Sequence, residues 1–137
     1  MYTHAITQQS PTLLVLDLEA TDFDALFVGA ARSVAELEGT PTADPLGPWV
    51  LVHAEAPDRK DLLVAWLNEL IDRAEVDHMV CPDAEIVELT ETSIRARVRG
   101  RPIESKNYQL VRAVTDACWL AMGPDNLSAS VHLELKD

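Results

Sequence analysis

The segment DLLVAWLNELI, residues 61–71, decides the fold, because its apolar side chains recur at intervals of three and four. This spacing places them along one side of a helix, which we expect to run from Asp58 to Glu75. Asp61 in its first turn and Arg73 in its last turn agree with the helix dipole. The apolar side of this helix consists of Leu62, Leu63, Trp66, Leu67, Leu70 and Ile71.

Three side chains of this helix differ in the role that we expect. Trp66 is interpreted as a core anchor, because it belongs to the apolar side. Asn68 and Glu69 project away from that side. The sequence leaves open whether these two hold a neighbouring loop or face a partner.

A second helix and two strands are predicted upstream. The apolar run that begins at Leu13 indicates a strand over residues 13–18 with one buried face. The upstream helix follows this strand and is expected from Asp22 to Glu38, capped by Thr21 and ended by Gly39. Its apolar side consists of Phe23, Leu26, Phe27, Ala30, Ala31, Val34 and Leu37. Residues 39–48 are rich in turn formers and predict an exposed connection to a strand over residues 49–55.

Several short strands follow the second helix. They are expected over residues 76–81, 84–89, 93–99, 110–121 and 127–135, mostly separated by Gly, Pro, Asn or Asp. The order is therefore β-α-β-α-β-β-β-β-β, and short loops favour antiparallel pairing. We predict an α+β fold with two helices packed on one face of a mainly antiparallel sheet.

Length and charge limit the classes of protein. The 137 residues, 47% of them hydrophobic, suit a single domain over residues 1–137 with its own core. No apolar run is long enough to span a bilayer and the N-terminus does not resemble a signal peptide, so we expect a cytoplasmic protein without a membrane partner. Only two cysteines occur, Cys81 and Cys118, and both are expected to be buried thiols. A net charge of −12 argues against general nucleic-acid binding.

The basic residues are concentrated in the second half of the chain. Arg95, Arg97 and Arg99 alternate with apolar residues, which places the three on one face of a strand, and Arg101 continues the series. One interpretation is a solvated face whose arginines pair with acids such as Glu85 or Glu88. The other is a surface that binds RNA phosphate or an acidic partner, because guanidinium groups bind both in bidentate fashion.

Signals of enzymatic chemistry are weak. The four histidines have no metal-like spacing, the serines lie in no nucleophile-elbow context, and five glycines form no phosphate-binding loop. We therefore do not expect an enzyme.

Four segments, in order, resemble the archease family. Residues 22–36 (DFDALFVGAARSVAE) are similar to its first helix, with a Leu-Phe-x-x-Ala-Ala core. Residues 61–71 resemble its second helix, which has a Leu-Leu pair followed by Trp-Leu-Asn-Glu-Leu. Residues 96–103 (ARVRGRPI) resemble a strand ending in a Gly-Glu-Pro-Ile turn, and residues 112–115 (RAVT) resemble a Lys-Ala-Val-Thr strand. The resemblance implies an accessory protein that assists the RNA-splicing ligase of tRNA halves by promoting its guanylylation and turnover.

The family's metal site is only partly matched. Its N-terminal His-Thr-Ala-Asp falls on residues 10–13, so Leu13 stands where the aspartate belongs. The C-terminal Asp and the aliphatic residue after it fall on Glu134 and Leu135, and Arg112 replaces the family's lysine. A shift in register could still bring Asp17 or Glu19 into the site. Because hard cations need several well-placed oxygens, we predict no bound metal, or calcium or magnesium held weakly.

The sequence favours two hypotheses for the function. In the first, the chain is an archease-like accessory protein for an RNA-splicing ligase, with indirect contact to RNA, and the sequence leaves open whether it also contacts RNA directly. In the second, it kept the archease fold, lost the metal site and serves another protein. In either case an anionic partner is expected to meet Arg95, Arg97, Arg99, Arg101 and Arg112.

Overall fold

The computed structural model describes residues 2–136, except for the side chains of residues 115–117. Two helices, α1 (Phe23–Glu38) and α2 (Arg59–Asp77), are combined with eight strands. The strands are β1 (Tyr2–Ser10), β2 (Leu13–Ala20), β3 (Gly39–Pro41), β4 (Val50–Glu55), β5 (Met79–Leu89), β6 (Ser93–Lys106), β7 (Leu110–Met122) and β8 (Leu127–Leu135).

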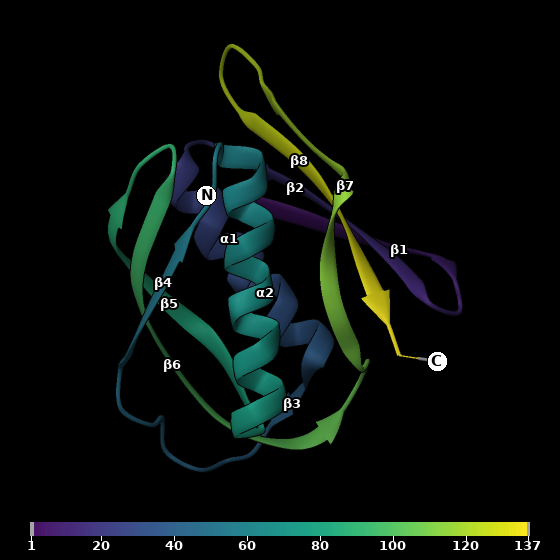
Figure 1. Cartoon of the computed structure of the whole chain (residues 1–137). Coiled ribbons are helices and arrows are strands. Elements are labelled where there is room, and N and C mark those ends of the chain that lie inside the picture. Colours follow the sequence, from purple (N-terminus) through teal and green to yellow (C-terminus); the bar gives the residue numbers. More distant parts are fainter. Residues whose placement is uncertain (1, 137) are drawn as a thin grey trace.

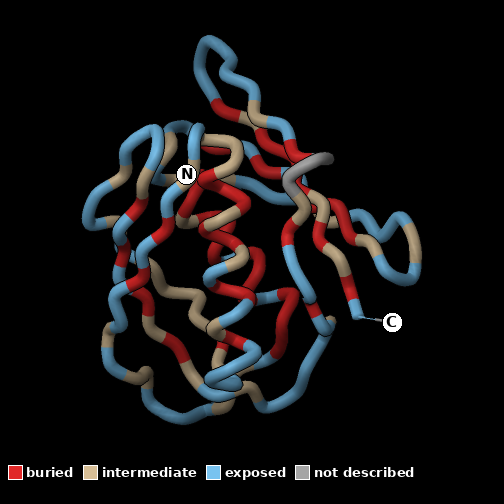
Figure 2. The backbone as a smooth tube through the Cα atoms, viewed as in Figure 1, coloured by how far each residue is buried: buried red, intermediate tan, exposed pale blue. Residues whose placement is uncertain are grey.

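The strands form two antiparallel sheets with the helices between them (Figure 1). The first sheet has the order β1-β2-β8-β7, and in the second β6 pairs with β3, β4 and β5. Helix α1 packs against β5 and β2, whereas α2 packs against β7 and β4. Buried residues occur along both helices and alternate with more exposed residues along much of the strands (Figure 2). The predicted α+β class is confirmed, with the strands divided between two sheets.

The predicted core is confirmed at the contact between the helices. Trp66 is completely buried, and its indole nitrogen donates a hydrogen bond of 2.9 Å to the carbonyl oxygen of Phe27. This bond satisfies the polar atom of the ring inside the core and fixes α2 against α1. The other side chains expected there are also buried: Leu26, Phe27, Ala30, Leu67 and Leu70.

Helix ends differ from the prediction by small amounts. Asp22, not Thr21, caps α1, and its side chain accepts a hydrogen bond from the Ala25 amide. Asp58 caps α2 in the same way by accepting from Asp61. Helix α2 runs two residues beyond Glu75 to Asp77, and His78 ends it in the left-handed conformation. Arg73 therefore lies before the last turn, where it pairs with Asp77 at 3.4 Å.

The remaining differences concern strands. Strands β1 and β3 were not predicted, because the side chains of β1 are mostly polar and exposed, and β3 has only three residues. The two strands predicted at 76–81 and 84–89 are one strand, β5, which is irregular between Val80 and Asp83. At this irregularity β5 comes so close to β6 that a Cβ atom at Gly100 would overlap the Val80 carbonyl. Within residues 2–136 no helix is long and apolar enough to cross a membrane.

Candidate functional site

The three family positions singled out in the sequence lie side by side on the first sheet. Leu13 on β2 is opposite Glu134 on β8, and Glu134 is opposite Arg112 on β7. These residues are far apart in the sequence, and only the pairing of three strands brings them together. The outward-facing row Leu13–Glu134–Arg112 is therefore the first candidate site.

Arg112 forms an ion pair with Glu134, the carboxylate of this row. Its Nε lies 3.0 Å from Oε2 of Glu134 and its terminal nitrogen lies 3.3 Å from Oε1. This two-point contact is the strong geometry of an arginine–carboxylate pair. The negative charge of Glu134 is thus matched by a cationic side chain.

The rest of the row adds no metal-binding oxygen from a side chain. Leu13 is aliphatic, and the Leu135 side chain is buried, while the Leu135 amide donates to the Thr12 carbonyl at 2.8 Å. Asp17 lies opposite Ser130, four residues along β2 from Leu13, and so stays about 13 Å from this row. The described residues contain no group of three or more His, Cys, Asp or Glu side chains that could hold a metal. Asp137, the last acidic residue of the sequence, lies outside the described residues.

The arginine series forms a second candidate surface on the outer face of β6. Arg97 is 2.8 Å from Glu85, Arg95 is 3.5 Å from Glu88, and Arg99 is 3.5 Å from Asp83. These are the acid pairs that the solvated-face interpretation anticipates on β5. Arg101 instead donates to the carbonyl oxygen of Asp44 at 2.7 Å.

Trp49 adds an aromatic ring that sequence reasoning missed on this surface. The guanidinium carbon of Arg99 lies 4.4 Å from the ring centroid and that of Arg97 lies 5.0 Å away. Cation–π contacts of this length orient both arginines. All three arginines of the face remain partly exposed, and exposed ion pairs contribute little stability. They can therefore exchange Glu85, Glu88 and Asp83 for an anionic partner at low cost.

Asn68 resolves the question that the sequence left open for α2. Its side-chain amide donates to the carbonyl of Ala113 at 3.3 Å, and its Oδ1 accepts from the Ala113 amide at 2.7 Å. Both bonds are those that a neighbouring strand would make with β7. Asn68 therefore holds β7, next to Arg112, against the helix, while Glu69 is exposed.

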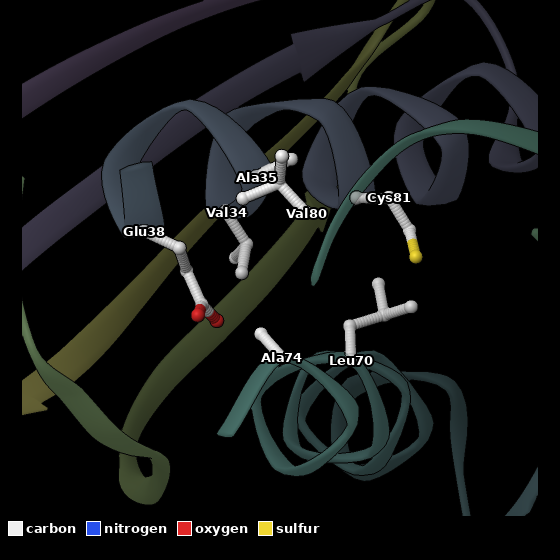
Figure 3. A pocket seen from close by; sticks show the side chains of 8 residues that line it. Val34, Ala35, Glu38, Leu70, Ala74, Val80 and Cys81 are labelled. Atoms are coloured by element: carbon white, nitrogen blue, oxygen red, sulfur yellow. The ribbon is translucent and has the colours of Figure 1, made fainter. Parts of the chain in front are cut away.

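A buried carboxyl group lies where α1, α2 and β5 meet (Figure 3). Glu38 is only 7% exposed, and one of its oxygens has no hydrogen-bond partner among the described residues. It lines a cavity of about 10 Å³, room for roughly one water, with Leu70, Ala74, Val80 and Cys81. Burial raises the pKa of Glu38 from 4.5 to about 8; Glu75 adds to the rise and Lys106 opposes it.

Both cysteines are free thiols, and the expected burial is confirmed for Cys118 only. Cys118 is buried and Cys81 is partly buried. Burial raises the pKa of both, that of Cys118 to about 11. Since the thiolate is the reactive form, neither side chain is an activated nucleophile.

The geometry described so far defines a small two-helix α+β protein with charged side chains paired on its outer faces. The profile of the Archease protein family (MTH1598/TM1083) matches residues 14–119. This match covers most of the chain, and the chain belongs to the archease family. The profile match includes neither Leu13 nor Glu134.

Two solved structures share the fold. An archease and possible chaperone from Thermotoga maritima is similar with a TM-score of 0.65 and 14% identity, over 88% of both chains. Protein 1598 of Methanobacterium thermoautotrophicum is similar with a TM-score of 0.71 and 16% identity, over 96% of this chain and 98% of that one. Among curated protein sequences, none matches significantly.

Proposed function

We propose that this chain is a cytoplasmic accessory protein that binds an RNA-splicing ligase and promotes its guanylylation and turnover. The observation that carries the proposal is membership of the archease family over residues 14–119. Arg112 pairs with Glu134 beside Leu13, and the described residues contain no group suited to a metal. These features agree with a protein that acts by binding.

In this proposal the chain assists the ligase by binding one ligase conformation more tightly than the others. A protein without its own catalytic groups can accelerate a partner only by binding one conformation of that partner more tightly than another. We assign this role to the ligase conformation that accepts the guanylyl group. The partly exposed arginines beside Trp49 form a surface for an anionic region of the ligase or of its bound RNA.

The first candidate site differs from the family's metal site in charge and in chemistry. Arg112 supplies one positive charge at Glu134, where a divalent ion would supply two and would demand further oxygens. We propose that the chain works with no metal, or with only weakly bound calcium or magnesium.

A second candidate function rests on the same substitutions. Leu13 and the Arg112–Glu134 pair are also what a chain would retain if it had kept the fold and changed its partner. In that case the chain is a binding module for another protein. The source genome discriminates the two, because the first function requires that it encode the ligase.

The proposed function is tested by guanylylation of the ligase from the same organism. Purified ligase is incubated with labelled GTP alone, with this chain, or with an unrelated acidic protein of similar size. The fraction of labelled ligase should rise only with this chain. Equal labelling in all three reactions would exclude the ligase as the partner and favour the second candidate.

A further inference from the structure

The hairpin formed by β7 and β8 carries two large apolar side chains that are at least half exposed. Trp119 is 50% exposed and Met122 is 73% exposed, although Cys118 beside them is buried. The hairpin tip projects beyond the rest of the sheet (Figure 1), and its backbone is mostly exposed (Figure 2). Since successive side chains of a strand point to opposite faces, Trp119 and Met122 lie on different faces of the hairpin. Large exposed apolar side chains mark interaction sites.

The side chains in the sheet rows next to Trp119 are short or acidic. In the first sheet Trp119 lies opposite Ser130, and Ser130 lies opposite Asp17. The next row toward the tip consists of Ala121, Ser128 and Glu19. Half of the Trp119 surface remains exposed beside these side chains. Met122 is exposed on the opposite face near the tip, so the hairpin offers one apolar anchor on each face.

The charge around the hairpin is mainly negative, although Lys60 of α2 lies near Cys118 together with Asp58 and Asp61. The acids Asp17, Glu19 and Asp125 are exposed near it. Between Arg112 and Lys136 the sequence contains no lysine or arginine, and neither β1 nor β2 contains one. A partner that surrounds the hairpin with basic side chains is therefore electrostatically matched, whereas an acidic or nucleic-acid surface is repelled.

We propose that the β7–β8 hairpin inserts Trp119 and Met122 into an apolar cleft of a partner protein that is rimmed by lysine and arginine. This assignment rests on the proposed function, which makes the RNA-splicing ligase the partner. An enzyme that joins RNA ends presents basic surface to the phosphates, and so meets the charge requirement. Tryptophan dominates binding energy when it fills such a pocket, and methionine adapts to the shape of the remaining space.

The experiment measures binding of the same organism's ligase by titration calorimetry. Trp119→Ala is expected to weaken binding by about 10-fold or more, and Met122→Ser by a few-fold. Val76→Ser is the matched control, since Val76 is 75% exposed but lies in the last turn of α2, outside both the hairpin and the arginine surface. Circular dichroism checks that each variant is folded. The double variant Asp17→Lys and Glu19→Lys should slow association and reduce its dependence on salt.

Each outcome is informative. Loss of affinity in Trp119→Ala with no change in Val76→Ser supports the docking assignment. Unchanged affinity in Trp119→Ala overturns it but leaves the proposed function standing. Failure of the unaltered chain to bind the ligase overturns both. Binding of tRNA alone that depends on Trp119 also overturns the assignment, because the ring would then stack on a base.

Discussion

The buried carboxyl of Glu38 makes the stability of this protein depend on pH. Its side chain lies at the C-terminal end of α1, where the helix dipole disfavours negative charge, and one oxygen lacks a partner among the described residues. Burial raises its pKa from 4.5 to about 8. In the unfolded chain the same group releases its proton near the ordinary value. Between these two pH values the folded state therefore holds a proton that the unfolded state has lost.

The sign and size of the effect follow from this difference. The unfolded state binds fewer protons in this window, so the free energy of unfolding falls as pH rises from about 4.5 to 8. Each pH unit corresponds to about 1.4 kcal/mol, so the whole window corresponds to roughly 5 kcal/mol as an upper value. Such a loss is a large part of the stability of a small domain.

The assay is urea unfolding of the unaltered chain and of Glu38→Gln at intervals from pH 5 to pH 9. The glutamine keeps the shape of the side chain and cannot ionise, so the variant should become the more stable of the two as pH rises. The difference should grow by about 1.4 kcal/mol per unit and level off above pH 8. Glu36→Gln, an exposed change on the same helix, is the control. Parallel curves for the unaltered chain and Glu38→Gln would refute the reasoning.

Three further predictions follow from the core and the two candidate sites. Trp66→Ala should lower the free energy of unfolding by about 3 to 5 kcal/mol, because it removes a buried ring and the bond to Phe27; a loss below about 1 kcal/mol in denaturant titration would contradict this packing. Calorimetric titration with calcium, magnesium and manganese should show millimolar binding or none; micromolar affinity that disappears in Glu134→Gln would show a working metal site. Charge reversal at Arg97 and Arg99 should weaken binding of an anionic partner and flatten its salt dependence without unfolding the chain, and unchanged affinity would identify the face as merely solvated.

The helices and their buried sides could be predicted because their signals are local. Apolar spacing marks both helices over many residues, and Trp66 is buried as its position requires. The cap of α1 was wrong by one residue, since Thr21 and Asp22 are neighbouring residues of the kinds that cap helices. Strand β1 was missed because its polar sequence lacks an apolar face, and its pairing with β2 comes from tertiary contact.

The sites depend on contacts that no local pattern contains. Leu13, Arg112 and Glu134 were singled out by family resemblance, and only strand register shows that they adjoin. The two bonds of Asn68 to Ala113 join residues 45 positions apart. Glu38 follows the apolar side of α1, and nothing in the sequence indicates that α2 and β5 bury it. These features arise from packing between distant segments.

The most direct test of the central claim is multiple-turnover RNA joining by the ligase of the same organism. Excess cleaved RNA, GTP and a limiting amount of ligase are incubated with and without this chain, and joined product is counted per ligase molecule. The account predicts repeated rounds of joining only when the chain is present. The same product yield with and without the chain would contradict it.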